Sequence, residues 1–411
     1  MASTDDTTAT TGTSGSDSTT KEDTPTVTTE NKENADEKKD TSNAVEEPPE
    51  LKEPILFDCS TFGHAKMVAL ANGTYQDRIK ASMPASDVTP ALALSQTPMT
   101  FWEDFVATAF SAFGVPVAVF NIPIALFVIG KFLVGNVALT FQLFGLFVIL
   151  PLALMPQKFN PDSLQSWLAL TMLKYYSWRL LLEEFPSPNR PRILVGPPHG
   201  VFPYGCLMTM ICYPSTAGIF CRGLAARAAV VTPIFKQILR TVGIVDANRD
   251  TARRVLEKPS CLGISTGGVA EIFETNADDE VILLKERVGL IKLAIRTGAD
   301  LQPCYIYGSN DVLSCWTGEG IPGANALLSR ISRKLGFGVI VIFGRFGLPI
   351  PRRVPLLGVC GKAIRTDHMK CENPTKEQIE EVQGLLIKHM EAVFQRYKKL
   401  YKFDEKHLII K

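Results

Sequence analysis

The segment Arg192-Ile-Leu-Val-Gly-Pro-Pro-His-Gly200 indicates the fold class of this chain. Its first four residues form a short apolar run that predicts a buried strand, and the Gly-Pro-Pro that follows must end that strand. Residues from Val201 onward are apolar again and predict a helix after the turn. His199 therefore stands at a strand-to-helix turn, where backbone N–H groups are unpaired and a side chain can project toward a ligand.

Apolar runs and helical stretches continue to alternate toward the C-terminus. This alternation predicts an α/β domain over residues 156–411, with a mixed sheet flanked by helices. The expected strands cover residues 193–195, 261–265, 281–284, 301–307 and 337–343, and the expected helices cover 250–257, 288–297 and 374–401. The last helix opens with a capping box formed by Thr375 and Gln378, and Gly298 is expected to close the second one.

The N-terminal part of the chain divides by composition into three segments. Residues 1–54 are rich in Thr, Ser and charged side chains and nearly lack large apolar ones, so we expect a disordered tail. Residues 55–104 show no clear period and are interpreted as a poorly defined linker. Residues 105–155 carry one charge, Lys131. One membrane span needs about 20 apolar residues, so this stretch predicts a helical hairpin in a membrane, with its turn at Gly130-Lys131 or at Gly135-Asn136.

A buried helix pair in a soluble protein is the alternative for residues 105–155, and the unbroken apolar length disfavours it. The following stretch, residues 161–180, also has a helical pattern. It contains aromatic residues of the kind found at membrane–water boundaries, namely Trp167, Tyr175, Tyr176 and Trp178. An interfacial helix and a helix packed on the domain both remain open.

Charge and cysteine usage exclude several classes of function. The net charge of +1 and the lack of a basic run interleaved with aromatics give no reason to expect a nucleic-acid partner. The nine cysteines are scattered, with no CxxC pair, which argues against a disulfide framework and against a zinc site. We therefore predict no metal, and a domain that faces a reducing compartment.

Further clusters follow the expected strands, where α/β folds place their sites. In Gly267-Gly-Val-Ala-Glu271 the glycines Gly267 and Gly268 permit close backbone approach, and a carboxyl group follows them. Basic side chains stand near other expected element ends, and they are candidates for binding the phosphates of a nucleotide-like carrier: Arg249, Lys285, Arg287 and Lys292. Taken singly, each of these charges is more often a solvated surface group than a ligand contact.

One pattern favours different chemistry. Gly263-Ile-Ser-Thr-Gly267 matches the G-x-S-x-G turn of serine hydrolases, with Ser265 as the nucleophile. The apolar run before it is short, because Pro259 and Ser260 interrupt it. A serine hydrolase remains the alternative that this motif supports.

Taken together and in order, these blocks resemble the type-2 diacylglycerol acyltransferase family, from about Phe105 to the C-terminus. The resemblance rests on the hairpin and on six blocks: Pro198-His-Gly, Arg249-Asp-Thr251, Gly267-Gly-x-Ala-Glu271, Arg287-x-Gly-x-x-Lys-Leu-Ala294, Gly298-Ala-Asp-Leu-x-Pro303 and Gly361-Lys-Ala-Ile364. It implies a glycerolipid-acyltransferase-like fold and an enzyme of the endoplasmic reticulum membrane that makes triacylglycerol from diacylglycerol and acyl-CoA.

The resemblance also implies partners and a location. Acyl-CoA is a co-substrate rather than a cofactor, diacylglycerol and membrane lipid are the other partners, and a homo-oligomer is left open. The tail and the catalytic domain are expected on the cytosolic side, with the lipid droplet as a further location. Monoacylglycerol acyltransferase and wax-ester synthase are alternatives within the family, and an inactive membrane scaffold is an alternative outside it.

The resemblance also implies roles for individual residues. His199 is expected to act as the general base on the acceptor hydroxyl, with Glu271 orienting the imidazole. Backbone N–H groups around Gly200 would stabilise the oxyanion. Two positions depart from the related patterns: Pro197 replaces the first histidine of His-Pro-His-Gly, and Tyr204 stands where related glycerolipid enzymes place an aspartate.

Overall fold

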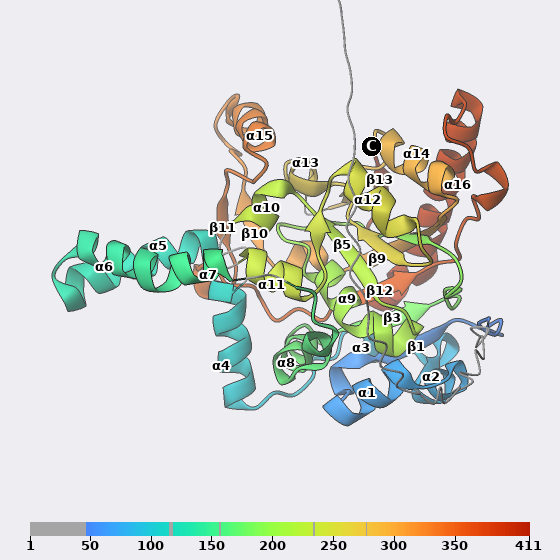
Figure 1. Cartoon of the computed structure of the whole chain (residues 1–411), viewed down its shortest axis with the longest axis horizontal. Helices are drawn as coiled ribbons and strands as arrows, with labels where there is room; N and C mark the ends of the chain where they lie inside the picture. Colours follow the sequence, from blue (N-terminus) through green and yellow to red (C-terminus); the bar gives the residue numbers. More distant parts are fainter. Residues whose placement is uncertain (1–46, 115–117, 156–157, 233–234, 277) are drawn as a thin grey trace, which may run out of the picture. The chain divides into compact units, whose positions relative to one another are not determined.

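The computed structural model describes residues 47–411 except 115–117, 156–157, 233–234 and 277 (Figure 1). Of the tail expected over residues 1–54, residues 1–46 therefore lie outside the described part of the chain. At the start of the described part, the carboxylate of Glu47 accepts hydrogen bonds from Ser187 Oγ at 3.1 Å and from Asn189 Nδ2 at 2.8 Å.

A nine-stranded mixed sheet forms the centre of the domain, in the order β2-β1-β3-β12-β9-β4-β7-β5-β6. In that order the strands are Met83–Pro84, Ile55–Asp58, Arg179–Leu182, Leu357–Cys360, Asp300–Tyr307, Arg192–Val195, Cys261–Ile264, Cys221–Ala225 and Val245–Asp246. β4 runs parallel to both of its neighbours, β7 and β9. The expected strands at 193–195, 261–265 and 301–307 are the three adjacent strands at this centre.

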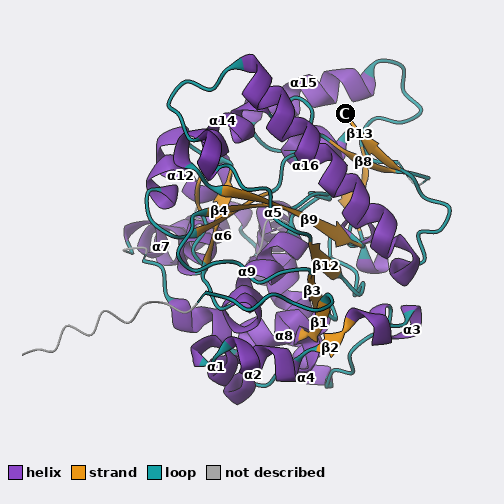
Figure 2. Ribbon diagram, turned by 90° about the vertical axis from the view of Figure 1, so that its right-hand side faces the viewer, coloured by secondary structure: helices purple, strands orange, loops and turns teal. Residues whose placement is uncertain are grey.

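Two apolar cores lie on the two faces of the sheet, because successive side chains of a strand point to opposite faces. In β4, Ile193 and Val195 belong to one core and Leu194 to the other. One core is covered by α1 (His64–Asn72), α8 (Trp167–Tyr175) and α9 (Tyr204–Ala217). The other is covered by α12 (Arg249–Leu256), α14 (Val288–Thr297) and α16 (Lys376–Tyr397) (Figure 2).

The three predicted helices of this half are present, and their ends follow the local signals. Gly298 closes α14 with φ +68°, a left-handed conformation that glycine adopts without steric cost. Thr375 and Gln378 form the expected reciprocal capping box of α16. The α16 residues that repeat at helical spacing, Ile379, Val382, Leu386, Met390 and Val393, are all buried.

Two predicted strands lie outside the main sheet. The segment 281–284 becomes β8 (Glu280–Ile282), which pairs in parallel with β13 (Leu408–Ile410). The segment 337–343 contributes only β11 (Val341–Phe343), which pairs with β10 (Ser314–Trp316). An apolar run predicts a strand but not its partner, since pairing depends on segments distant in the chain.

Residues 55–104 are not a linker in the structure. β1 and β2 add an antiparallel edge to the sheet next to β3. The same segment contains α1, the shorter helices α2 (Tyr75–Ala81) and α3 (Pro90–Ala93), and the first turn of α4 (Phe101–Ala109). β1 is only four residues long and almost wholly buried, so it shows neither the alternation nor the length that marks a strand in a sequence.

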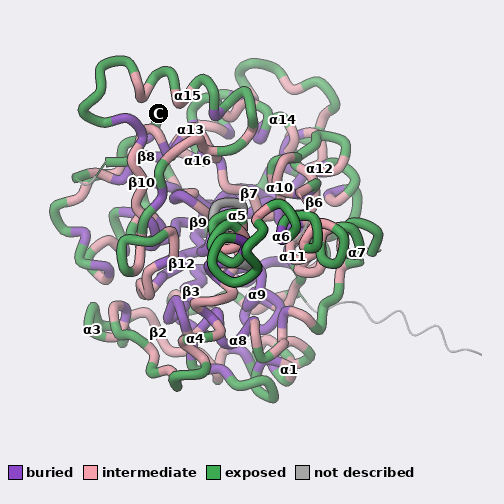
Figure 3. The backbone as a smooth tube through the Cα atoms, turned by 90° about the vertical axis from the view of Figure 1, so that its left-hand side faces the viewer, coloured by how far each residue is buried: buried purple, intermediate pink, exposed green. Residues whose placement is uncertain are grey.

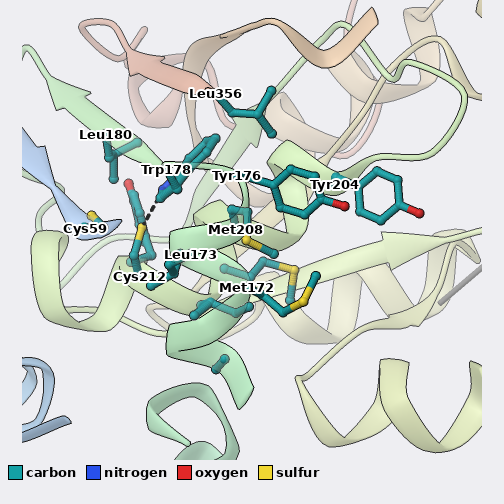
Figure 4. Packing of buried hydrophobic residues seen from close by; sticks show 14 of the residues in the cluster. Cys59, Met172, Leu173, Tyr176, Trp178, Leu180, Tyr204, Met208, Cys212 and Leu356 are labelled. Atoms are coloured by element: carbon teal, nitrogen blue, oxygen red, sulfur yellow. Dashed lines mark hydrogen bonds between the residues drawn. The ribbon is translucent and has the colours of Figure 1, made fainter. Parts of the chain in front are cut away.

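The helix expected over 161–180 ends at Tyr175, and the chain continues as β3. Tyr176 and Trp178 are fully buried, and Trp178 Nε1 lies 3.1 Å from Cys212 Sγ (Figure 4). This segment therefore packs on the domain, which was one of the two open alternatives. Among the four aromatic residues of the prediction, only Trp167 is exposed, at 54%.

The apolar hairpin consists of two helical arms. The first is α5 (Ala118–Ile129) with the π-helical turn η4 (Gly130–Val134), and the second runs through α6 (Val137–Phe144), η5 (Gly145–Ile149) and α7 (Leu150–Leu154). The chain reverses at Gly135, with φ +70°, and Asn136, whose side chain accepts from the N–H of Leu139. The second of the two predicted turn positions is thus the one used.

Most side chains of these arms that the structure describes are exposed or half-buried (Figure 3). By length and composition Val137–Leu154 is a candidate membrane span, whereas the apolar helix Ile122–Val134 is shorter. Eighteen helical residues measure about 27 Å, close to the roughly 30 Å of a bilayer core. The expected start at Phe105 is corrected, because α4 packs on the domain through Ala107 and its Asp104 pairs with Arg345.

Candidate active site

The carboxyl ends of β4, β7 and β9 meet at one edge of the sheet, and the His199 turn lies between the two neighbouring strands. The N–H of Gly196 donates to the carbonyl of Ile264 at 2.8 Å, which extends the β4–β7 pairing by one residue. On the other side, the N–H of Ile306 in β9 donates to the carbonyl of Pro197 at 3.0 Å. The backbone that carries His199 is therefore held from both sides.

The imidazole of His199 is oriented by its own turn. Nδ1 lies 2.8 Å from the carbonyl oxygen of Gly200. Because a carbonyl only accepts, this bond assigns the proton to Nδ1 and leaves the lone pair on Nε2. Burial lowers the pKa of His199 below its ordinary value of 6.5, and the hydrogen bond to Gly200 opposes that change in part. The side chain is therefore a neutral base near pH 7.

Glu271 contacts His199, but not at the imidazole. One carboxylate oxygen accepts the backbone N–H of His199 at 2.5 Å, and the other accepts the N–H of Leu283 at 3.1 Å. The expected bond between Glu271 and the ring is thus corrected: Gly200 orients the ring, and Glu271 holds the backbone. Burial raises the pKa of Glu271 to about 7, against the two N–H groups and Arg287, which lower it.

Two glycines of the predicted blocks are required by close approach. Gly200 has φ +63°, and a Cβ there would lie 2.7 Å from the carbonyl oxygen of Ser309, beyond the end of β9. A Cβ on Gly267 would lie 2.0 Å from the carboxylate of Glu271. Gly268 has φ +55° with no atom within 4 Å of the Cβ position, so only its backbone conformation favours glycine.

Unpaired backbone donors lie next to the imidazole. In the part of the chain that the structure describes, the N–H groups of Gly200 and Val201 donate to no protein acceptor. The 14-residue helix α9 begins three residues later, at Tyr204, so the positive end of its dipole lies close to these groups. The N–H of His199 is taken by Glu271. The N–H groups of Gly200 and Val201 are thus available to a developing oxyanion.

Of the four predicted basic residues, the structure ties one to this edge. Arg287 Nη2 donates to the carbonyl of Gly267 at 3.1 Å, and its buried Nε has no partner among the described residues. Arg249, Lys285 and Lys292 are exposed, and their side chains make no hydrogen bond or ion pair within the described ranges. The structure therefore does not bring these three together with His199.

Ser265 follows β7 and precedes α13 (Gly268–Ile272), as a nucleophile turn would require. Its φ is not positive, however, and its buried Oγ has no hydrogen-bond partner, His199 included, among the described residues. The strained turn and the Ser–His contact of a serine hydrolase are thus lacking. The neighbouring thiol of Cys206 is no nucleophile either, because burial raises its pKa to about 12.

Three residues near His199 and Glu271 are not predicted from the sequence, because no motif marks them. Leu283 contributes only a backbone N–H, Ser309 only a carbonyl, and Cys206 a buried thiol. Tyr204, at the position of the related aspartate, is buried, and its ring packs on Tyr176 and Phe202. Burial keeps its pKa well above 10, so it cannot supply a carboxylate's charge.

Comparison with known proteins adds to this geometry. Residues 158–411 match the family model described as "Diacylglycerol acyltransferase". The chain is 26% identical over 257 residues to diacylglycerol O-acyltransferase 2 of Danio rerio, covering 58% of this chain and 70% of the relative. It is 24% identical over 250 residues to diacylglycerol O-acyltransferase 2A of Umbelopsis ramanniana, covering 55% and 70%.

A longer alignment reaches diacylglycerol O-acyltransferase 2-like protein 6 of Bos taurus, with 26% identity over 323 residues, 71% of this chain and 91% of the relative. Among solved structures, the 1-acyl-sn-glycerophosphate acyltransferase PlsC of Thermotoga maritima aligns with 66% of this chain and 96% of its own. The TM-score of this alignment is 0.34, and the sequence identity is 13%.

Proposed function

Because this chain belongs to the diacylglycerol acyltransferase family, we propose that it transfers the acyl group of acyl-CoA to the free hydroxyl of diacylglycerol. The observation that carries the proposal is the orientation of His199. Its Nδ1 is engaged by Gly200, so an unprotonated Nε2 is available as a base beside two backbone N–H groups that have no acceptor among the described residues. These are the groups that acyl transfer to an alcohol requires.

In the proposed reaction, Nε2 of His199 removes the proton of the acceptor hydroxyl while that oxygen attacks the thioester carbonyl. The N–H groups of Gly200 and Val201 stabilise the negative charge on the carbonyl oxygen of the tetrahedral intermediate. The carbon–sulfur bond then breaks and the new ester forms. The CoA thiolate leaves and takes the proton from Nε2, which restores the neutral imidazole.

Glu271 acts in this proposal as a positioning residue. By accepting the N–H of His199 it fixes the backbone from which the imidazole projects, and by accepting the N–H of Leu283 it ties that backbone to the segment after β8. Arg287 holds the backbone of Gly267 through Nη2, and its buried Nε has no hydrogen-bond partner among the described residues. We propose that Arg287, with the exposed Arg249, Lys285 and Lys292, meets the phosphates of CoA.

The acceptor is tested by supplying the purified protein with labelled acyl-CoA and, separately, with diacylglycerol, monoacylglycerol or a long-chain alcohol. Triacylglycerol as the main product supports the proposal. A preference for either other acceptor would identify the monoacylglycerol acyltransferase or the wax-ester synthase activity of the same family. Transfer to none of them would favour an inactive scaffold.

The raised pKa of Glu271 predicts an acid limb in the pH dependence of turnover. Protonation turns one oxygen from an acceptor into a donor, so activity should fall as the pH drops through about 7. In Glu271→Gln only His199 titrates, with a pKa below 6.5, so the limb should move to lower pH.

The substitution should also cost about tenfold in kcat at the optimum, because an amide NH₂ then faces one of the two backbone donors. The measurement is kcat against pH at saturating acyl-CoA for both proteins. An acid limb at the same pH in both would show that Glu271 does not set it.

We further propose that the hairpin anchors the enzyme in the endoplasmic reticulum membrane or on a lipid droplet, with both flanking parts cytosolic. The sequon Asn72-Gly-Thr74 tests this topology, since Asn72 is exposed and a luminal copy would be open to glycosylation. We expect no glycan on Asn72 and full protease sensitivity of the tail in sealed microsomes. Because β1 pairs with β3, Asn72 lies on the same side of the membrane as the rest of the domain, so a glycan at Asn72 would place the whole domain in the lumen and refute the proposed topology.

A further inference from the structure

Apolar side chains are exposed on a second surface, separate from the hairpin. This surface, here called the α15 surface, comprises residues 321–348 and includes α15 (Ala324–Leu335) and β11. Its exposed large apolar residues are Ile321, Leu327, Ile331, Leu335, Phe337, Val341, Phe343, Phe346 and Leu348, with exposed fractions from 38% for Phe343 to 76% for Phe346. Exposed large apolar side chains grouped in one segment of the chain are typical of a contact surface.

The apolar face of α15 points away from the domain, and a polar residue lies on its buried side. Leu327, Ile331 and Leu335 repeat at four-residue spacing on one face, and all three are exposed. The buried position of the helix is a serine, Ser332, whose hydroxyl accepts the N–H of Val339 at 2.8 Å. A helix that covers its own domain would turn its leucines inward. This helix therefore presents its apolar face to something outside the described chain.

The charge of the segment indicates what that partner is. No acidic residue occurs between Glu319 and Asp367. Arg330, Arg333 and Lys334 on α15 are exposed and form no ion pair with the described residues. Free basic side chains beside an exposed apolar face are the features of helices that lie in the interface of an anionic bilayer.

The α15 surface is also continuous with the root of the hairpin. Arg345 donates to both carboxylate oxygens of Asp104 at 3.0 Å and to Thr108, so it joins this segment to α4. α4 itself exposes Phe101, Trp102 and Phe105. Figure 1 shows β10 and β11 beside the hairpin helices and α15 beyond them.

The segment also contacts α13, the helix that carries Glu271. A Cβ on Gly338 would lie 3.8 Å from Ile272, the residue after Glu271 in α13. We propose that the α15 surface lies on the anionic leaflet of the membrane that holds the hairpin, so that the active-site edge of the sheet faces the lipid from which the acceptor comes. The inference rests on the membrane attachment proposed above and not on the reaction.

The test uses the full chain in vesicles of phosphatidylcholine with phosphatidylserine. Single cysteines carry an environment-sensitive fluorophore in Leu327→Cys and Phe346→Cys. Phe147→Cys in the hairpin, 70% exposed, is the positive control. Lys376→Cys at the start of α16, with an 82% exposed side chain, is the negative control. The parent protein, labelled in the same way, measures the background from its native thiols.

We expect lipid-borne nitroxides to quench the probes at 327, 346 and 147, and aqueous iodide to quench only the probe at 376. Replacing Arg330, Arg333 and Lys334 together by glutamate should make the probe at 327 accessible to iodide. The probe at 147 should still be quenched by the lipid-borne nitroxides. Iodide quenching at 327 and 346 with lipid quenching at 147 would overturn the inference. Protection of 327 and 346 from both quenchers would also overturn it and indicate a protein partner or a second copy. Iodide quenching at 147 would instead refute the hairpin's attachment.

Discussion

Replacing His199 by alanine is expected to reduce turnover by about 10²- to 10⁴-fold, the usual contribution of a positioned general base. The loss should be chemical rather than structural. The imidazole's described hydrogen bond is the one to its neighbour Gly200, and the backbone N–H that binds Glu271 remains in the variant. The measurement is the transfer rate per unit of enzyme at saturating acyl-CoA, with the protein content of the membranes determined independently.

Ser265→Ala is the matched control, because it removes a buried hydroxyl that has no hydrogen-bond partner among the described residues. Its turnover should stay within about twofold of the parent, since no bond is lost. Unchanged turnover of Ser265→Ala together with loss of turnover in His199→Ala supports acyl transfer by a histidine base. The reverse pattern would assign the chemistry to Ser265 and to a hydrolase.

Gly200→Ala is expected to lower turnover by about 10²-fold, the effect of displacing catalytic groups by about 1 Å. Its Cβ would lie 2.7 Å from the carbonyl oxygen of Ser309, and that atom belongs to a backbone that cannot rotate away. The positive φ of Gly200 adds strain of about 1–2 kcal/mol for any other residue. The turn must therefore shift, and with it the imidazole and the N–H of Val201.

Alanine substitutions at two further glycines serve as comparisons for Gly200→Ala. Gly268→Ala keeps open space around its Cβ and meets only the strain of φ +55°, so its loss should be smaller. Gly384→Ala lies within α16 with no atom within 4 Å, and it should be neutral or slightly stabilising. Thermal unfolding in detergent separates loss of folded protein from loss of rate. Equal activity of the Gly200→Ala and Gly384→Ala variants would contradict the close approach to Ser309.

Much of the site could be located from the sequence because it follows local patterns. The apolar run ending at Val195 and the Gly-Pro-Pro after it placed His199 at a strand end, and the pair Gly267-Gly268 marked a turn that meets another group closely. The long apolar stretch predicted the hairpin, and its turn occurs where a glycine and a helix-capping asparagine are adjacent. Each of these signals is carried by neighbouring residues or by one uninterrupted stretch of the chain.

The tertiary structure decided what depends on distant segments. That Glu271 binds the backbone of His199 rather than its ring follows from where α13 starts beside β4, and no spacing in the chain encodes this. The contacts of Leu283 and Ser309 are made by backbone atoms, which carry no residue identity.

The sequence by itself determined the α/β class, the hairpin and the turn that carries His199, because hydrophobic period and turn chemistry act locally. Only the tertiary structure decided that residues 55–84 close one edge of the sheet, that Arg287 alone of the four basic candidates reaches the site, and that the leucines of α15 face outward. Pairing partners and the outward face of a helix are set by packing between segments far apart in the chain, which a one-dimensional pattern does not record.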